Sequence, residues 1–418
     1  MVLAHSNVRH HVFPNGLVLI AETMDYVRTA AFNFLIPAGY AYDPATLAGT
    51  SNLLSGMITR GAGPFDNQAL MLEMDALGLD REESVGMLHT RIWGATIARN
   101  LLPSLELYSH VVLRPHLPDA ELPPIQALAL QDIEALEDDP KGKTMLELRR
   151  RHLPAPLGND RRGTPESIEA NTVANLKAFH RRHFRPNATI LSVAGNIDWQ
   201  ALVDKVGLLF GDWSPQPEVT LSHSAAELGK SHLQKDTQQT QIGLAYDSIP
   251  VTDKDYFNAM GAVQVLSGGM SSRLFTEVRE KKGLCYSVWA SYQGMKDRGV
   301  VLCYAGTTNE RAQDTLDSML LELKRIEDGI EPDEVQRIQA GIKSSLIMQE
   351  ESTSARAGAI ASDWYYYGRV RPFEEIQAEV NALTAEKIVD YCRRKPLVKG
   401  TLVTMGPREL NYLSSSVS

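Results

Sequence analysis

Hydrophobic and polar positions in the first half of the chain form strand-like and helix-like segments in turn. Asn15-Gly16 separates the apolar stretches 10–13 and 17–21. This predicts a β-hairpin, because glycine adopts a positive φ easily. Extended apolar runs at 30–36 and 90–97 predict two further strands. Apolar residues at helical spacing, opposite polar faces, predict helices at 46–59, 66–77, 100–113 and 119–136.

The second half shows the same kinds of segment. The pattern predicts strands at about 241–245, 284–293 and 298–306, and helices near 254–267, 310–328 and 331–350. Hairpins followed by long helices are typical of α+β domains. We therefore expect a mostly antiparallel sheet in each half, with helices packed on one face.

The two halves also share four landmarks in the same order. The apolar run Ile190–Gly195 matches Thr401–Gly406, which ends 211 positions later (406 − 195). Three further landmarks keep nearly the same offset and order: Leu105 with Leu316, 125–126 with 335–336, and 167–170 with 375–378. The sequence therefore predicts two copies of one fold.

A polar, proline-containing segment lies between the two copies. The stretch 210–217 contains two prolines, and the residues up to about Lys230 show no apolar period. These features are typical of a linker. We expect an N-terminal domain at 1–213, a linker at 214–231 and a C-terminal domain at 232–418.

Composition limits the class of protein. A chain of 418 residues, 43% of them apolar, suits two domains of ordinary size. Its net charge of -9 argues against nucleic acid, because a phosphate backbone attracts basic surfaces. The sequence has no apolar run long enough for a membrane helix, and its start lacks the pattern of a signal peptide. Three widely spaced cysteines provide neither a disulfide framework nor a Cys-rich zinc site, so we expect a cytoplasmic chain.

The segment 268–288, GGMSSRLFTEVREKKGLCYSV, carries a specific resemblance. It is similar to the signature of the second domain in the pitrilysin/insulinase family of zinc metallopeptidases, which includes mitochondrial processing peptidase and insulin-degrading enzyme. The family's duplicated α+β domains, joined by a linker and arranged as a clamshell, match the organisation expected for the whole chain. The resemblance therefore implies a metalloendopeptidase-like protein.

Active members of this family carry an inverted zinc motif, His-x-x-Glu-His, on an early helix. Two histidines four residues apart share one helical face and can bind one metal, while the Glu activates the metal-bound water. In this chain the matching segment is 48–57, and Asn52 and Gly56 replace the histidines while Ser55 replaces the Glu. The resemblance places the distal ligand at Asp132.

An amide, a hydroxyl and one short carboxylate do not make a catalytic zinc site. We therefore expect that this chain binds no metal and is inactive alone. A serine hydrolase built on Ser51 or Ser55 is a rival interpretation, but the chain has no Gly-x-Ser-x-Gly elbow and no histidine close to them in sequence.

The other half of the family's active site is retained. Arg279 and Tyr286 match the pair that, in family members, hydrogen-bonds the scissile region and favours the developing oxyanion. Such donors act beside a metal. The resemblance therefore implies a heterodimer, in which a homologous partner with His-x-x-Glu-His holds zinc and this chain supplies Arg279 and Tyr286 in trans. The partners would together enclose an unfolded peptide.

Other motifs have a structural and a functional interpretation. The glycine-rich loop Gly268, Gly269, Met270 and Ser271 either touches substrate or forms a turn in which Ser271 or Ser272 caps the next helix. His180 and His183 have chelating spacing, but their arginine neighbours favour a structural role. Arg9-His10-His11 is expected on the outer face of the first strand, and Trp364–Tyr367 in packing between domains rather than in an aromatic binding site.

Two alternatives to the helper subunit stay open. One is a purely structural subunit, like the core subunits of a respiratory complex that share this fold. The other is a homodimeric chamber that binds peptides without cleaving them. A neighbouring gene of similar length that encodes His-x-x-Glu-His would favour the helper subunit.

Overall fold

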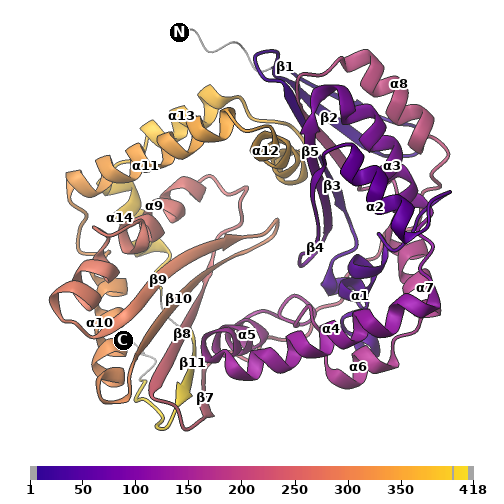
Figure 1. Cartoon of the computed structure of the whole chain (residues 1–418). Helices are drawn as coiled ribbons and strands as arrows, with labels where there is room; N and C mark the ends of the chain where they lie inside the picture. Colours follow the sequence, from indigo (N-terminus) through magenta and orange to yellow (C-terminus); the bar gives the residue numbers. More distant parts are fainter. Residues whose placement is uncertain (1–6, 398–399, 413–418) are drawn as a thin grey trace. The chain divides into compact units, whose positions relative to one another are not determined.

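The computed structural model describes residues 7–397 and 400–412, and the chain forms two compact units. Both contain a sheet and helices, so the α+β class expected from the sequence is confirmed (Figure 1). Unit 1 comprises Met1–Ala135, Asn159–His223 and Ile347–Pro372, and unit 2 comprises Leu136–Gly158, Ser224–Leu346 and Phe373–Ser418.

The units differ from the domains expected along the sequence by two exchanged segments. Residues 136–158 precede the linker but belong to unit 2, and 347–372 follow it but belong to unit 1. The helices in these segments, α5 (Pro140–His152) and α12 (Thr353–Tyr367), begin 213 positions apart (353 − 140). They are therefore equivalent elements of the two copies, and each packs on the sheet of the other copy.

Unit 1 contains a six-stranded sheet with the order β1-β2-β6-β3-β5-β4. All neighbouring pairs are antiparallel except β2 and β6. The strands are β1 (Asn7–Val12), β2 (Val18–Thr23), β3 (Thr29–Ile36), β4 (Asp80–Val85), β5 (Thr90–Ile97) and β6 (Ile190–Gly195).

The other helices of unit 1 come from the first half of the chain. They are α1 (Thr50–Met57), α2 (Asn67–Ala76), α3 (Leu101–Leu113), α4 (Leu122–Ala135), α6 (Pro165–Ala170), α7 (Val173–His183) and α8 (Trp199–Phe210). Alternate strand residues pack in the main core with side chains such as Tyr108 of α3 and Phe210 of α8. On the opposite face, Ile20 of β2 packs with Ile360 of α12. Strand β6 is consequently buried at every position.

Unit 2 repeats this plan with the order β7-β11-β8-β10-β9, in which only β7 and β11 are parallel. Its strands are β7 (Lys230–Gln234), β8 (Gln239–Ser248), β9 (Cys285–Gly294), β10 (Gly299–Thr308) and β11 (Thr401–Gly406). Its helices besides α5 are α9 (Tyr256–Ser267), a π-helix (Leu274–Lys281), α10 (Ala312–Arg325), α11 (Pro332–Glu350), whose end belongs to unit 1, α13 (Phe373–Asn381) and α14 (Ala385–Arg394).

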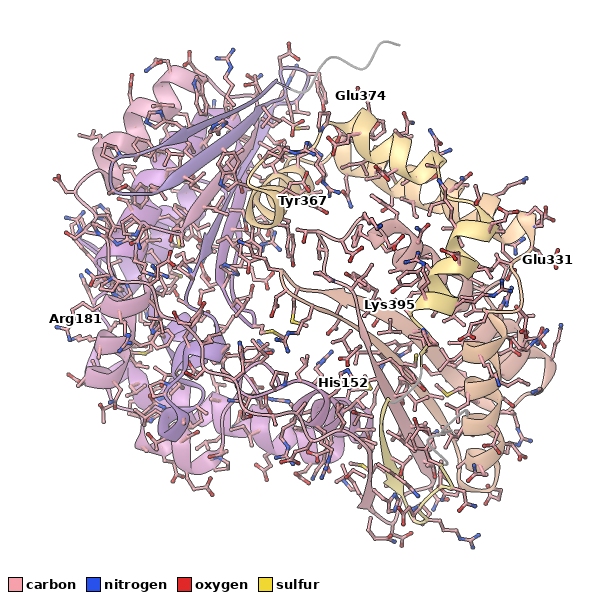
Figure 2. The ribbon with its side chains drawn as sticks, turned by 180° about the vertical axis from the view of Figure 1, so that it is seen from behind. His152, Arg181, Glu331, Tyr367, Glu374 and Lys395 are labelled. Carbon is pink, nitrogen blue, oxygen red and sulfur yellow. The ribbon has the colours of Figure 1, made fainter. Side chains whose placement is uncertain are left out.

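Helix α5 covers the second face of this sheet (Figure 2). Gly243 of β8 leaves room for it, because a Cβ at this position would lie 3.2 Å from Leu148 Cδ2. At the end of α5, the Nδ1 atom of His152 lies 3.0 Å from the Oγ1 atom of Thr401 in β11. As in unit 1, the strand beneath the exchanged helix, β11, is buried throughout.

Helix α12 is held on unit 1 by a buried ion pair. Arg356 donates through Nη2 to Glu22 Oε2 of β2 at 2.6 Å and through Nη1 to Glu350 Oε1 at 2.7 Å. The side chains of Arg356 and Glu22 are only 12% and 6% exposed. The Ser192 hydroxyl of β6 also donates to the Ala357 carbonyl at 2.7 Å. These bonds satisfy polar groups that would otherwise be buried without partners.

The strands and helices predicted from the sequence are confirmed, with shifts at their ends. The predicted helix at 46–59 shortens to α1 because Gly49 adopts φ 88°, which ends the preceding 3-10 turn Ala45–Leu47. Helix α4 begins at Leu122, just before two prolines, which suit the first turn of a helix. Among the described helices, none combines the length and hydrophobicity needed to span a bilayer. All three cysteines are buried and unpaired.

Candidate functional site

Helix α1, which carries the degenerate zinc motif, starts at a loop closed by Asp43. The Asp43 carboxylate accepts hydrogen bonds from the backbone N–H of Gly49 at 2.8 Å and of Ser51 at 2.9 Å. Burial raises the pKa of Asp43 to about 7, although the bonds from Ser51 and Gly49 favour the ionised form. The first turn of α1 is therefore held by a carboxyl group that titrates near neutral pH.

The three positions of the zinc motif lie together on α1. Asn52, Ser55 and Gly56 are half-buried in this helix. A Cβ on Gly56 would lie 3.1 Å from Ile125 Cγ2 of α4, so the neighbouring helix fills the space that a larger side chain would need. Ser51 is 1% exposed, which leaves its hydroxyl out of reach of a substrate and weakens the hydrolase alternative.

Asp132 lies on α4 with its side chain exposed. No hydrogen bond or ion pair joins it to α1 within the described residues. Over residues 7–397 and 400–412, no three His, Cys, Asp or Glu side chains gather in a way that could hold a metal ion. The side chains at the motif positions of α1 therefore do not suit the zinc ion that active family members bind. That this chain binds no metal stays a prediction.

Arg279 and Tyr286 meet on the surface of unit 2. The Arg279 guanidinium carbon lies 5.2 Å from the centre of the Tyr286 ring and 4.6 Å from that of Phe275. Tyr286, near the start of β9, is 81% exposed. Arg279 also faces Glu280 at 3.7 Å, and its side chain is 36% exposed. The structure thus brings the two residues together and leaves both available to a ligand.

A π-helix positions this pair. Leu274–Lys281 forms a π-helix of eight residues, and segments of this kind are frequent at functional sites. Leu274 and Val278 face the core, while Phe275 and Arg279 stack on each other outside it. Arg273, just before the π-helix, donates to both Glu334 oxygens at 2.8 Å and to the Gly329 carbonyl at 2.7 Å. The segment that carries Arg279 is therefore fixed at its beginning.

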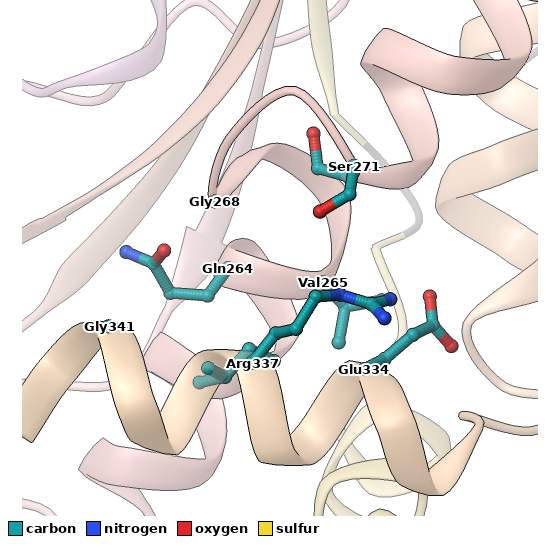
Figure 3. Close-up of a pocket in the computed structure, with 9 residues that line it drawn as sticks. Gln264, Val265, Gly268, Ser271, Glu334, Arg337 and Gly341 are labelled. Carbon is teal, nitrogen blue, oxygen red and sulfur yellow. The ribbon is translucent and has the colours of Figure 1, made fainter.

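The glycine-rich loop lies beside a small cavity of about 70 Å³. Gly268 and Ser271 line it together with Gln264, Glu334 and Arg337 (Figure 3). Gly269 has φ 152° and Met270 is 82% exposed, so this part of the loop faces solvent. The geometry is compatible both with a turn and with a surface that contacts peptide.

The capping role considered for Ser271 and Ser272 is wrong. Arg273 occupies the N-cap position of the π-helix, where no side chain caps the backbone. The Ser272 hydroxyl instead donates to the Gly269 carbonyl at 2.6 Å. This acceptor lies three residues earlier in the same glycine-rich loop.

The paired histidines of α7 have structural surroundings. His180 lies 2.9 Å through Nε2 from the Val112 carbonyl, and His183 packs against Phe179. Burial lowers the pKa of each to about 4, so both are neutral at physiological pH. Arg181 on the same helix is exposed and points outward (Figure 2).

The two remaining motifs meet within unit 1. Arg9, His10 and His11 of β1 are exposed, as expected. Trp364, near the end of α12, packs against His10 with ring centres 4.7 Å apart and ring planes tilted by 46°. The aromatic segment therefore takes part in the packing of the exchanged helix.

Comparisons with known proteins show what this chain resembles. Residues 171–342 match the model of the family described as the peptidase M16 inactive domain. An uncharacterized zinc protease of Rickettsia bellii is 25% identical over 95% of this chain and 97% of its own length. The uncharacterized zinc protease YmxG of Bacillus subtilis is 24% identical over 93% of this chain and 95% of its own length. Residues 171–342 thus resemble the M16 family, also called the pitrilysin/insulinase family, and the chain as a whole is similar to proteins named zinc proteases.

Two solved structures share the fold of this chain. A peptidase M16 inactive domain from Pseudomonas fluorescens superposes with a TM-score of 0.90 at 21% identity, over 97% of this chain and all of that one. A protease from Helicobacter pylori gives a TM-score of 0.88 at 19% identity, over 96% of this chain and all of that one.

Two residues of the site are not apparent from the sequence pattern alone. Phe275 lies four positions before Arg279, a spacing that brings two side chains together on a helix, and the structure shows that the two stack. Asp43 could have been noticed as a carboxylate six residues before Gly49, but only the structure shows that both its oxygens bind the start of α1.

Asp43 leads to an expected pH dependence of stability. The pKa of Asp43 is 3.8 in the unfolded chain and about 7 in the folded one, so the folded state holds the proton more tightly. The resulting stability is fully present below pH 3.8 and is lost as the pH rises through about 7. The loss is up to about 4 kcal/mol, at roughly 1.4 kcal/mol per pKa unit. We expect the free energy of unfolding, measured in urea, to fall between pH 4 and pH 7 relative to Asp43→Asn and to level off above pH 8. Parallel curves for the two proteins would contradict this.

Proposed function

We propose that this chain is the non-catalytic subunit of a two-chain zinc metalloendopeptidase of the M16 family, and that Arg279 and Tyr286 act at a zinc site held by its partner. One observation carries the proposal. The chain keeps an exposed, preassembled Arg–Tyr pair, whereas its own α1 offers an amide, a hydroxyl and a glycine where a metal would be bound. A pair of this kind has no evident structural task, because Tyr286 is largely outside the core.

The chemistry of the pair suits an oxyanion. The Tyr286 hydroxyl and the Arg279 guanidinium are both hydrogen-bond donors, and a guanidinium also carries a fixed positive charge. If a partner holds zinc, the metal would supply an activated water there, and Arg279 and Tyr286 would donate hydrogen bonds to the peptide carbonyl oxygen as it gains negative charge. The stack with Phe275 restricts Arg279 before substrate arrives, which reduces the entropy lost on binding.

The substrate we propose is an unfolded polypeptide. An extended peptide would add as a strand to the edge of the partner's sheet, a mode in which backbone hydrogen bonds provide affinity. The exposed loop at Met270 would contact the same peptide. The relatives named zinc proteases, which match this chain over more than nine-tenths of its length, support a role in proteolysis.

Native mass spectrometry of the tagged chain, purified from its own organism, tests this proposal. We expect a complex near twice the 46.2 kDa of this chain, with one zinc and a homologous second chain that carries His-x-x-Glu-His. Mixing the two chains should then produce peptidase activity that neither has alone. A metal-free monomer or homodimer would contradict the proposal and favour a scaffold or a peptide-binding role.

A further inference from the structure

An acidic cavity of about 570 Å³ opens on the surface of unit 2, outside the Arg279–Tyr286 pair. It lies where the start of the π-helix meets the end of α10 and the start of α11. Six carboxylates and three arginines line it, so its formal charge is negative. Ser271, Glu334 and Arg337 line both this cavity and the smaller one at the glycine-rich loop, which Figure 3 shows.

Part of this charge is already neutralised. Arg273 forms two parallel hydrogen bonds of 2.8 Å with the Glu334 carboxylate. Both side chains are largely buried, and Arg273 also binds the Gly329 carbonyl. This pair is therefore a fixed wall of the cavity and provides no free charge to a ligand.

Glu322 is the unusual member of the lining. This residue of α10 is 2% exposed, and its Oε1 accepts a hydrogen bond of 2.8 Å from Arg325 Nη1. Its Oε2 is buried and has no hydrogen-bond partner in the described part of the chain. A buried carboxylate oxygen without a donor is unfavourable. A donor that entered the cavity would relieve this.

Three further carboxylates extend the negative charge toward solvent. Asp328, Glu331 and Asp333 line the cavity with exposed side chains, and none forms an ion pair within the described residues. Of the arginines that line the cavity, Arg337 is the one without an ion pair among the described residues. The cavity thus has a buried acceptor in Glu322 and an excess of negative charge around it.

The chemistry favours an organic cation over a metal ion. No three acidic or imidazole side chains of the described residues converge closely enough to hold a metal. An ammonium or guanidinium group needs only one or two carboxylate acceptors and brings several N–H donors. We propose that this cavity binds an alkylammonium or guanidinium group on a flexible chain, either a free polyamine or a lysine or arginine side chain of a polypeptide, with Glu322 as its buried acceptor.

Isothermal titration calorimetry on the full chain without any partner tests this inference independently of the proposed function. The probes are spermidine, a short peptide with one lysine and the same peptide with norleucine in its place. We expect spermidine or the lysine peptide to bind, and Glu322→Gln to weaken that binding at least tenfold. Asp333→Asn, which removes an exposed carboxylate with no ion pair, should weaken it a few-fold in a protein that folds normally.

The control is Glu169→Gln on α6 in unit 1, which removes one exposed carboxylate outside the cavity. Binding of spermidine alone identifies a polyamine site, and binding of the lysine peptide but not of its norleucine analogue identifies a site for polypeptide side chains. The inference is overturned if neither probe binds, if Glu169→Gln weakens binding as much as Asp333→Asn, or if calcium chloride binds at Glu322 and the organic cations do not.

Discussion

Arg279→Ala is expected to reduce the turnover number of the assembled peptidase by about 10²- to 10³-fold, the usual effect of removing one oxyanion donor. Tyr286→Phe, which removes a single hydroxyl, should have an effect of similar size. Both residues lie on the surface and neither belongs to the core of unit 2, so the variants should fold and assemble normally. Steady-state kinetics of the reconstituted enzyme measure the effect, which should fall on the turnover number more than on KM.

Matched controls separate this role from general surface effects. Arg298→Ala removes an arginine that pairs with Asp297 at 3.0 Å, and Tyr26→Phe removes the hydroxyl of a tyrosine that is 68% exposed. Both controls should retain full turnover. If Arg279→Ala and Tyr286→Phe do the same, the pair has no part in catalysis, although the chain could still be a subunit.

Arg356→Ala is expected to destabilise unit 1 by about 3–5 kcal/mol, because it leaves the buried Glu22 carboxylate without its partner. The change also frees α12 from Glu350. Urea unfolding measures the loss. Hydrogen exchange should place it in β2, β6 and α12, whose contacts depend on this pair, with little change in unit 2.

Two comparisons check the reason for this effect. The double replacement Arg356→Met with Glu22→Gln should recover part of the stability, since no charge is then left buried. Asp297→Asn, which breaks an exposed ion pair, should cost less than about 1 kcal/mol. An Arg356→Ala protein as stable as the Asp297 variant would show that the ion pair does not hold α12.

The amphipathic helices and the long apolar strands were predictable because their residues bury one local face. The family signature at 268–288 and the Arg279–Tyr286 spacing were equally predictable, since all these residues lie within one short segment, whereas only the structure shows that Leu274–Lys281 forms a π-helix. Strand β4 was not predicted. Its sequence, Asp80–Val85, is mostly charged because β4 lies at the edge of the sheet, so its pairing with β5 comes from the backbone rather than from an apolar pattern.

The sequence alone predicted the duplication, from landmarks repeated at a nearly constant offset, and the α+β class, from the local pattern of apolar residues. The family resemblance implied the loss of the zinc ligands, because the residue types at 52, 55 and 56 differ from the motif. The exchange of α5 and α12 was decided by tertiary packing. Strands β6 and β11 are apolar enough that both of their faces must be buried. The local sequence does not indicate that the helix on the second face of each sheet comes from the other copy. The stack of Arg279 on Phe275 and Tyr286, and the unpartnered oxygen of Glu322, likewise depend on contacts between elements.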